Sequence, residues 1–439
     1  MLGVLANRTY RNLFLAQVIS LVGTGLGTVA LALLAFNIAG DKAGAVLGTA
    51  LFIKMAAYVG LSPIAGALAG LLPRRAFLVS LDAVRTGIAL MLPFVTQTWQ
   101  IYLLIFFLQA ASAAFTPTFQ ATIPDVLPDE GEYTKALSLS RLAYDLENLL
   151  SPAIAGALLT VMTFHDLFVG TALGFVASAL FVLSVSLPSP KTAQLRSFRD
   201  RLFRGTRIFF ATPRLRGLMA VNLAVAAGGA FVIVNTVVFV QSRFGLTEQQ
   251  TALALASFGG GSMLVALALP RLLARAPDRL AMLTGVAVLA AGTGLASMAG
   301  DFELLLGLWF VLGGGYSLAL TPSGRLLRRS THPEDRPAVF AAQFALSHAC
   351  WLITYPLAGW VGAAFGLPVS ASVLAGVAFA GVVGAALLWP RTDREVVEHD
   401  HPDLPDGHPH LAEGDHRGDH RHAHAYVIDD LHYMWPHGR

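Results

Sequence analysis

The sequence is poor in charged residues and in cysteine. Of its 439 residues only 13% are Asp, Glu, Lys or Arg, whereas 55% are apolar. A soluble domain carries about 25% charged residues, so this chain has roughly half of the usual solvating surface, which excludes the class of water-soluble enzymes. The single cysteine, Cys350, excludes an intramolecular disulfide, and the sequence has no Cys/His spacing typical of a zinc finger.

The charges that are present divide the chain into two unlike parts. Residues 1–390 hold 25 Lys and Arg against 16 Asp and Glu, a net charge of +9, whereas residues 391–439 hold 5 against 11, a net charge of −6. Ten of the 13 histidines also lie in the second part. A basic, very apolar body therefore ends in an acidic, histidine-rich tail.

The apolar residues of the body fall into long stretches. A helix needs about 20 mainly apolar residues to cross a bilayer. By this criterion the sequence predicts twelve transmembrane helices, near residues 12–38, 43–71, 76–97, 99–117, 136–161, 165–187, 216–242, 250–272, 280–300, 303–322, 337–362 and 368–389. The first stretch is too long for a cleaved signal peptide. We therefore expect an all-α integral membrane protein whose main partner is the lipid bilayer.

The positions of Lys and Arg predict how these spans are oriented. With the N-terminus in the cytoplasm, nearly all Lys and Arg between the spans lie in cytoplasmic loops, and the outer loops hold only Lys42 and Arg243. Both termini, and hence the tail, are predicted to be cytoplasmic. The one long basic connection divides the spans six and six. The predicted parts are an N-terminal bundle (1–187), a cytoplasmic linker (188–215), a C-terminal bundle (216–390) and the tail (391–439).

The two halves repeat at a constant offset of 205 residues. Arg11 matches Arg216, and Arg74 matches Arg279. Because each half has an even number of spans, the repeats are parallel, which predicts a transporter whose two bundles move about a central midplane site. The longest match is Thr116-Pro117 with Pro128-Asp129-Glu130, which recurs as Thr321-Pro322 with Pro333-Glu334-Asp335.

Two motifs stand near the first two spans: Asn7-Arg8-Thr9-Tyr10-Arg11 before the first, and Gly66-Ala67-Leu68-Ala69-Gly70 with Arg74, Arg75, Asp82 and Arg85 after the second. By these motifs residues 7–390 resemble the major facilitator superfamily, which implies two six-helix bundles. In that family a carboxylate at the position of Gly70 helps to latch the bundles on the cytoplasmic side. The resemblance therefore implies a latch that is weaker here or built from Asp82 and Arg85.

Polar residues at the centre of the predicted spans are the candidates for the transport path. A charge in the hydrocarbon is costly, so an ionisable residue there is a functional candidate by default. We expect Asp145 and Glu147 to supply carboxylate ligands to a bound cation and His348 to supply an imidazole. The further candidates are Asn148 and Asn235 as oxygen ligands, and Lys54.

The same residues also allow a structural interpretation. Arg141 and Asp145 are four residues apart and share a helix face, so they are expected to pair with each other. Lys54 can neutralise Glu147 across the N-terminal bundle. For His348 the alternative is a neutral imidazole hydrogen-bonded to a neighbouring helix. Both interpretations stay open for Lys54 and Arg141, whereas for the two acids we favour a functional role.

Beyond Pro390 the apolar periodicity ends, and Pro, Gly, Asp and His dominate. Few of these residues can bury a core, so we expect a disordered tail. Its histidines are spaced so that several imidazoles can reach one metal ion, and imidazole suits zinc, copper, iron and nickel. The alternative is a charged, solubilising tail. The candidate ligands are His399, His401, His408, His410, His416, His420, His422 and His424.

A closer resemblance adds a cargo and a direction. The segments 120–130 and 136–148, together with the histidine tail, resemble the bacterial nickel-resistance exporters of the superfamily. This resemblance implies secondary active export of Ni²⁺, with Co²⁺ as the second candidate, from the cytoplasm across the bacterial inner membrane. The sequence has no nucleotide-binding motif, so we expect a proton gradient to drive transport, with protonation of the ligands releasing the ion outside.

Two other functions fit parts of the chain. The body alone is equally typical of an exporter of amphipathic drugs. The tail alone is typical of a membrane protein that senses or stores metal. In every case we expect a monomer that is not an enzyme, has no cofactor apart from the transported metal and has no nucleic-acid partner.

Overall fold

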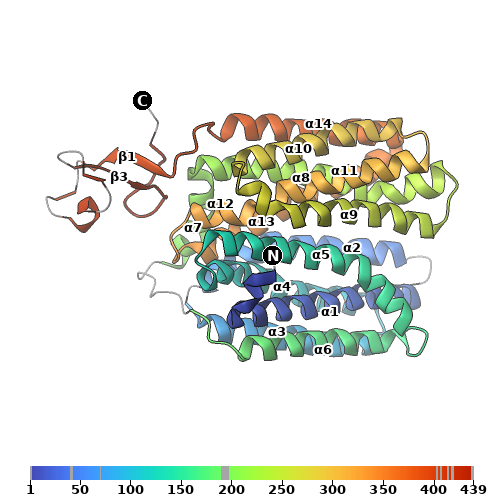
Figure 1. Ribbon diagram of the computed structural model, residues 1–439. Helices are drawn as coiled ribbons and strands as arrows, with labels where there is room; N and C mark the ends of the chain where they lie inside the picture. The colour runs from blue at the N-terminus through green and yellow to red at the C-terminus, as the bar shows by residue number, and fades with distance from the viewer. Residues whose placement is uncertain are drawn as a thin grey trace.

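The computed structural model describes residues 2–39, 43–69, 71–188, 197–401, 404–405, 408–412, 415–416 and 420–436. Within these ranges the side chains of residues 43–45, 148–149, 152–153, 248, 409, 412 and 416 are outside the description. In the described part, twelve helices of 18 residues or more lie side by side in two groups of six. Figure 1 shows the N-terminal group (blue to green) below the C-terminal group (yellow-green to orange).

The N-terminal bundle begins with the short 3₁₀ helix η1 (Leu2–Ala6). A second short 3₁₀ helix, η3 (Leu92–Phe94), extends the third long helix. The six long helices are α1 (Arg8–Ala39), α2 (Ala43–Ala69), α3 (Arg74–Met91), α4 (Thr98–Val126), α5 (Glu130–Leu158) and α6 (Phe164–Leu183).

The C-terminal bundle repeats this plan. Its first helix continues as the π-helix η4 (Val238–Arg243), and the 3₁₀ helix η5 (Ala296–Met298) extends its third. Its six long helices are α8 (Pro213–Val237), α9 (Glu248–Leu273), α10 (Asp278–Leu295), α11 (Phe302–Leu320), α13 (Arg336–Phe365) and α14 (Leu367–Leu388).

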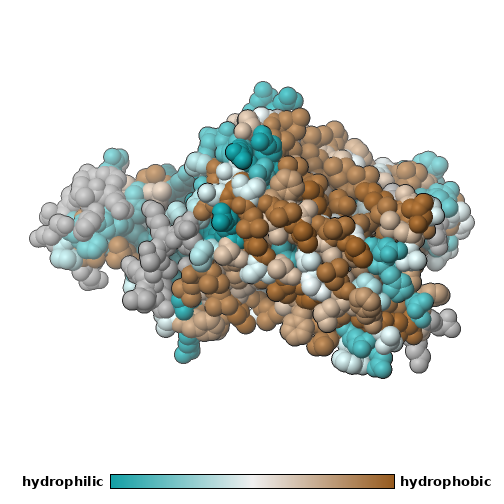
Figure 2. Space-filling model, turned by 90° about the horizontal axis from the view of Figure 1, so that it is seen from below, coloured by the Kyte–Doolittle hydropathy of each residue, from teal (hydrophilic) through white to brown (hydrophobic). Residues whose placement is uncertain are grey.

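The outer surface of the two bundles is suited to lipid. Eleven of the described helices are long and apolar enough to cross a membrane. Figure 2 shows brown apolar side chains over the middle of the molecule, with teal hydrophilic side chains gathered toward its two ends. A belt of this kind is what a protein needs where it faces hydrocarbon rather than water. The predicted all-helical, two-bundle membrane fold is confirmed.

Two of the predicted spans differ in detail from the structure. The span predicted at 136–161 corresponds to α5, which is long enough to cross but is not among the eleven, because Lys135, Arg141, Asp145 and Glu147 interrupt its apolar residues. The span predicted to end at Pro117 continues to Val126, since α4 accommodates two prolines. Proline is tolerated in membrane helices because neighbouring groups satisfy the freed carbonyls.

The bundles meet chiefly where α2 packs on α13 and where α5 packs on α9. Ser62 of α2 donates a hydrogen bond to the carbonyl of Ala341 in α13 at 3.0 Å. One turn away, a Cβ on Gly66 would lie 2.6 Å from the Ala341 Cβ, so the contact requires glycine at this position. The close approach therefore lies where α2 ends and α13 begins.

That end of the molecule carries most of the arginines, and we call it the basic end, defined by Arg74, Arg204, Arg214, Arg325 and Arg336. The linker contains an amphipathic helix at this end, α7 (Phe198–Ala211), which the sequence did not predict. The helix packs tightly on α13, since a Cβ on Gly205 would clash with the Ala338 carbonyl. A second short helix, α12 (Ser323–Arg329), also lies there (Figure 1).

The tail folds beyond the basic end, at the left of Figure 1. A three-stranded antiparallel sheet has the order β1-β3-β2, with His399 paired to His422. Tyr426, Val427 and Ile428 are buried, and Tyr426 and Ile428 belong to the hydrophobic core of the C-terminal bundle. The expectation of a disordered tail is wrong for these residues, because this apolar segment packs on the body and the histidines pack on one another. The elements are β1 (Val396–Asp400), the 3₁₀ helix η6 (Pro409–Ala412), β2 (Asp415–His416) and β3 (Arg421–Ala425).

Candidate transport and metal sites

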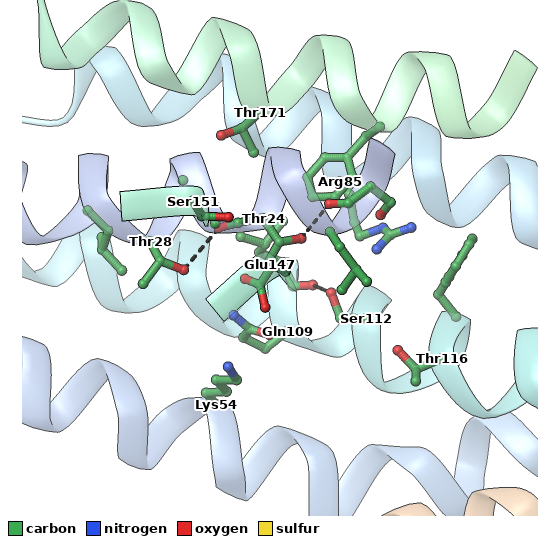
Figure 3. Close-up of a pocket in the computed structure, with 18 of the residues that line it drawn as sticks. Thr24, Thr28, Lys54, Arg85, Gln109, Ser112, Thr116, Glu147, Ser151 and Thr171 are labelled. Carbon is green, nitrogen blue, oxygen red and sulfur yellow. Dashed lines mark hydrogen bonds between the residues drawn. The ribbon is translucent and has the colours of Figure 1, made fainter. Parts of the chain in front are cut away.

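A cavity of about 510 Å³ lies inside the N-terminal bundle, among helices α1 to α6. Glu147 of α5, Gln109 of α4 and Lys54 of α2 reach it from three helices and point toward one another in Figure 3. Gln109 is held in place because its amide oxygen accepts a hydrogen bond from Tyr58 at 2.8 Å. The cavity therefore brings together one carboxylate, one ammonium and one oriented amide.

The charges of Glu147 and Lys54 act on each other across this cavity. Among the described residues neither is in a salt bridge, and both side chains are partly exposed to the cavity. The expected proximity of the two residues is confirmed, but they are not locked in a contact ion pair. The carboxylate is consequently accessible to a ligand that enters the cavity.

Hydroxyl side chains on α1 and α4 make the cavity wall rich in acceptors. Thr24 and Thr28 each donate to the carbonyl four residues earlier at 2.9 Å, and Ser112 does the same at 3.0 Å (Figure 3). A hydroxyl whose hydrogen is used in this way presents only its oxygen lone pairs to the cavity. Together with Glu147 these oxygens favour a cation or a hydrogen-bond donor as the occupant.

Asp145 does not join Glu147 in the cavity. Two residues apart on a helix, the two side chains point to different faces. Asp145 is buried at the boundary between the bundles, where it pairs with Arg141 and accepts a hydrogen bond from Ser262 of α9 at 2.7 Å. The Arg141 guanidinium lies over the Tyr316 ring of α11, 4.8 Å from its centroid. The pairing expected from the four-residue spacing is present, and it links the two bundles.

His348 of α13 lies outside the cavity, next to a residue that lines it. Its Nδ1 is 2.7 Å from the carbonyl oxygen of Phe344, which can only accept, so Nδ1 donates and Nε2 keeps the lone pair. The ring meets Tyr58 edge-on, with centroids 4.8 Å apart. His348 is thus across the bundle boundary from the cavity, one aromatic ring away from Gln109.

The two asparagine candidates are not brought to this cavity. Asn235 is buried between α8 and α14, where its amide is 3.5 Å from the Ser370 hydroxyl, so it packs two helices of the C-terminal bundle. The side chain of Asn148 lies outside the described residues.

Asp82 and Arg85 pair with each other inside the N-terminal bundle rather than across the boundary. Ser178 of α6 donates to Asp82 at 2.8 Å, and the Arg85 guanidinium is sandwiched between Phe115 and Phe175, 4.0 and 4.5 Å from their centroids. The expectation that this pair latches the bundles is therefore incorrect. Its contacts come from α3, α4 and α6, which belong to one bundle.

The contacts that do latch the bundles lie at the basic end. Asp125, at the end of α4, pairs with Arg74 of α3 and with Arg336, the first residue of α13. Arg75, which the sequence placed in the same group as Arg74, is exposed. Gly70 lies outside the described residues. A carboxylate on α4 thus joins the N-terminal bundle to the C-terminal one.

A second group of contacts repeats this connection. Arg325 of the C-terminal bundle pairs with Glu130 and with Asp278, and it donates to the Thr134 hydroxyl at 3.1 Å. Glu130 and Thr134 belong to α5, so these contacts also cross the boundary. The sequence did not single out Asp125, Arg325 or Arg336. These residues come together because distant loops meet in the folded protein, and no local sequence pattern predicts such a contact.

Six histidines of the tail converge on one point. Strand alternation places His399, His422 and His424 on one face of the sheet, η6 contributes His410, and His401 and His432 follow β1 and β3. The cluster contains two sets of four histidines. Within each set, one ring nitrogen from every histidine lies within 4.8 Å of the others. These sets are His399, His401, His410 and His432, and His399, His410, His422 and His424. We call the six residues the histidine cage.

The hydrogen bonds of the cage direct lone pairs into its centre. The Nδ1 atoms of His399, His424 and His432 are each 2.9 Å from an oxygen acceptor, namely a backbone carbonyl for the first two and the Asp429 carboxylate for the third. Nδ1 is therefore the donor, and Nε2 carries the lone pair. The Nε2 atoms of His399 and His432 are 3.0 Å apart, so two lone pairs face each other. Such an arrangement calls for a cation between them.

The protonation of the cage also suits a metal ion. Burial, with the neighbouring imidazoles adding to it, lowers the pKa of His399 and of His422 to about 4 and lowers the pKa of His401. These rings are neutral at pH 7, which is the form that binds metal. The donor set is all nitrogen and suits Zn²⁺, Cu²⁺, Ni²⁺ or Co²⁺ rather than Mg²⁺ or Ca²⁺.

The cage differs in membership from the predicted ligand list. Five of the eight predicted histidines belong to it. His408 instead accepts a hydrogen bond from the backbone N–H of His410 at 3.2 Å, and the Nδ1 of His420 is 3.1 Å from the carbonyl of His401. The side chain of His416 is outside the description. His432 was missed because it stands alone in the sequence, away from the His-x-His pairs.

The sequence profile of the Major Facilitator Superfamily matches residues 13–279 and 218–413. An uncharacterized MFS-type transporter of Bacillus subtilis (strain 168) is 23% identical over 353 residues, which are 75% of this chain and 82% of that protein. Macrolide efflux protein A of Streptococcus pyogenes is 24% identical over 152 residues, which are 32% of this chain and 37% of that protein. The similarity to the second relative is thus confined to a part of each chain.

Solved structures share the fold. The human organic anion transporter MFSD10 has a TM-score of 0.74 at 14% identity, over 86% of this chain and 99% of that one. A bacterial homologue of the iron transporter ferroportin in an outward-facing state has a TM-score of 0.70 at 15% identity, over 87% of this chain and 98% of that one. At such identities the likeness concerns the fold alone.

Proposed function

Because the chain belongs to the Major Facilitator Superfamily, and is therefore a secondary transporter rather than an enzyme, we propose that it exports a divalent transition-metal cation. The observation that carries the proposal is the histidine cage, whose converging lone pairs suit such a cation. The acceptor-lined cavity around Glu147 supports a cationic cargo in the membrane part. Ni²⁺ is the first candidate and Co²⁺ the second, on the resemblance to nickel-resistance exporters.

Charge balance in the cavity supports the proposal of proton antiport. Glu147 and Lys54 together are neutral, so a divalent ion on Glu147 would leave excess positive charge in a low dielectric. Release of the Lys54 proton reduces this excess, and return of the proton weakens the binding of the ion. We propose Glu147 as the carboxylate ligand, with Lys54 as the group that exchanges the proton. His348 and Asn148 are further proposed ligands, reached when the bundles move.

The proposed orientation places the basic end in the cytoplasm, with the protein acting as a monomer in a bacterial inner membrane. The gathering of arginine at one end supports this orientation. The cage would then meet cytoplasmic cations beside the entrance to the transport path.

One observation favours a second candidate, an exporter of amphipathic drugs. Aromatic residues line the same cavity, among them Tyr58, Phe115, Phe119 and Phe175. Macrolide efflux proteins are also among the relatives. A drug exporter would bind its cargo on these rings and use Glu147 only to bind the proton.

A sensitivity panel in cells tests the proposal. Cells that express the protein should tolerate Ni²⁺ or Co²⁺ better than control cells, with no change in tolerance to macrolides. Glu147→Gln should abolish this resistance, whereas Glu303→Gln, at an exposed position in the first turn of α11, should retain it. Resistance to macrolides without resistance to metal would favour the drug exporter.

Deletion of residues 391–439 separates export from sensing or storage. An exporter keeps part of its resistance without the tail, because the cavity is intact. Complete loss of resistance, with the body still inserted in the membrane, would mean that the protein acts by sensing or storing metal in its tail.

A further inference from the structure

We propose that the histidine cage is a regulatory site, at which one bound divalent transition-metal ion stabilises the closed arrangement of the basic end. The inference rests on the proposed function for the class of cation, but not for the cargo of the membrane cavity. It is carried by a continuous chain of contacts from the cage to the latch between the bundles.

The cage holds one ion at a time. Its two sets of four histidines share His399 and His410. The Nδ1 of His399 is committed to the Val397 carbonyl at 2.9 Å, which leaves a single lone pair on Nε2. A lone pair binds one ion, so the two sets are alternative arrangements for the same ion. Such a site reports whether a cation is present and does not store several.

The first connection from the cage to the body runs through Asp429. This carboxylate accepts from Nδ1 of His432 at 2.9 Å and contacts Nε2 of His332, which precedes α13, at 3.3 Å. A carboxylate behind a metal-binding histidine fixes the ring and strengthens the ligand. Here the same carboxylate also contacts the body through its other oxygen, so His432 of the cage and His332 of the body share one oriented group.

The second connection runs through the neighbouring residue. Asp430 pairs with Arg204 of the linker helix at 2.5 Å, and Arg204 pairs with Asp335 at 2.8 Å. Asp335 directly precedes α13, and the next residue, Arg336, forms the latch with Asp125. Three consecutive ion pairs therefore link the tail, the linker helix and the N-terminal bundle.

The beginning of the tail is docked as well. Asp393 pairs with Arg214 at 3.2 Å and with Arg329 at 2.6 Å, and it accepts from the indole of Trp389 at 3.0 Å. The tail is thus fixed to the C-terminal bundle at Asp393 and to the linker helix at Asp430. An ion that orders the strands in between stabilises both docking points together.

The direction of the effect follows from linkage. A ligand that binds the docked tail better than the released tail shifts the equilibrium toward docking, by up to about 100-fold at a concentration 100 times its Kd. Docking holds Arg204 and His332 in the arrangement that accompanies the closed latch. A high cytoplasmic concentration of the cation would therefore favour closure of the cytoplasmic entrance once the cargo has bound in the membrane cavity.

The test measures a distance across the basic end in the full-length protein. Spin labels at Ala76→Cys on α3 and Ala274→Cys after α9, both exposed positions, report the separation of the bundles in nanodiscs on a Cys350→Ala background. Zn²⁺ serves as the probe because it is diamagnetic and binds imidazole. The expected result is a shift of the distance distribution toward the short component, with one Zn²⁺ bound per chain.

Three variants separate the possible outcomes. His399→Ala with His410→Ala should remove both binding and the shift. Asp429→Asn with Asp430→Asn should retain Zn²⁺ binding, about 10–100-fold weaker because the carboxylate that orients His432 is lost. This double variant should lose the shift even when it is saturated with Zn²⁺. His165→Ala, a histidine of the body at α6, is the matched control and should behave as the parent protein.

Glu147→Gln separates this proposal from the cargo assignment. The shift should persist in that variant, because it arises in the tail. A Zn²⁺-bound parent protein with an unchanged distance distribution would overturn the regulatory proposal. So would an undiminished shift in the saturated Asp429→Asn, Asp430→Asn variant. Failure of Ni²⁺ transport with an intact shift would overturn only the proposed cargo.

Discussion

Asp125 of α4 pairs with Arg336 of α13 across the boundary between the two bundles. Both side chains are only 12% exposed, and Arg74 contacts the other oxygen of the same carboxylate. The latch of this transporter is therefore a carboxylate at the end of the fourth span, placed between two arginines from different bundles. The resemblance implies a carboxylate at the position of Gly70, and in the described part of the chain Asp125 is the carboxylate that joins the bundles at this end.

Arg336→Ala should open the basic end. The substitution leaves Asp125 with one arginine from its own bundle and removes a charge-assisted contact worth about 1.5–3 kcal/mol. Labelling of a cysteine placed beneath the latch, at Ser62, should become at least tenfold faster. Arg75→Ala is the control, since Arg75 is exposed, and it should label at the parent rate. Equal rates in the two variants would mean that the pair does not hold the bundles together.

Arg141→Ala should destabilise the protein, because it leaves Asp145 buried without its arginine. Breaking a buried pair in this way costs about 3–5 kcal/mol, whereas replacing both partners by apolar residues of similar size is often neutral. Thermal unfolding in detergent should therefore show a large loss for Arg141→Ala and a recovery in Arg141→Met with Asp145→Leu. Recovery of stability in the double variant together with full transport would show that Asp145 binds no cargo.

Metal titration of the purified protein should give one tight site per chain. His399→Ala should weaken this site far more than His424→Ala, because His399 belongs to both four-histidine sets and His424 to one. His432→Ala should behave like His424→Ala. Isothermal titration with Ni²⁺ or Zn²⁺ measures the stoichiometry and the affinities. Two equally tight ions per chain would contradict the shared-ligand geometry.

The docking of the tail should weaken as pH rises above neutrality. The hydrogen bond to Asp429 raises the pKa of His332. A raised pKa means that this contribution is fully present below the ordinary histidine value of about 6.5 and is lost as pH rises through the raised value. Hydrogen exchange of the amides at 426–432 should therefore accelerate with pH more steeply than the intrinsic exchange rate.

Two other groups do not change this expectation. Burial alone would raise the pKa of Asp429, but the hydrogen bonds from His332 and His432 lower this pKa well below its usual range. The carboxylate therefore stays charged at neutral pH. The cage rings with lowered pKa values are neutral in the folded tail near neutral pH. In the unfolded tail they are mostly neutral from about one pH unit above the ordinary value of about 6.5, so they add no pH dependence beyond that point. His332→Ala should remove the extra pH dependence, and an unchanged profile in that variant would assign it elsewhere.

The sequence was sufficient for the fold but only partly for the sites. Apolar length and the 205-residue repeat predicted the two bundles, because both are local or regular properties of the chain. Arg141 and Asp145 were matched by their spacing on one helix. The latch between Asp125 and Arg336 joins residues that are 211 positions apart, and no local sequence pattern predicts such a contact.

The directions in which side chains point set a further limit on what could be predicted from the sequence. Asp145 and Glu147 look like a pair of ligands in sequence, yet the helix directs them to the bundle boundary and to the cavity respectively. In the tail, composition suggested disorder, whereas the alternation in His422-Ala423-His424 places two imidazoles on one face of a strand. His432 joins the cage only through the turn made by Asp429, which the histidine spacing does not indicate.

The central claim is that the N-terminal cavity carries a divalent transition-metal cation in exchange for protons. The most direct measurement is Ni²⁺ movement into proteoliposomes under an imposed pH gradient, with acidification or alkalinisation of the lumen followed in parallel. The account predicts Ni²⁺ accumulation coupled to opposite proton movement, abolished by Glu147→Gln and retained in Glu303→Gln. Equal Ni²⁺ accumulation in vesicles that contain Glu147→Gln, or none with the parent protein while a macrolide is transported, would contradict it.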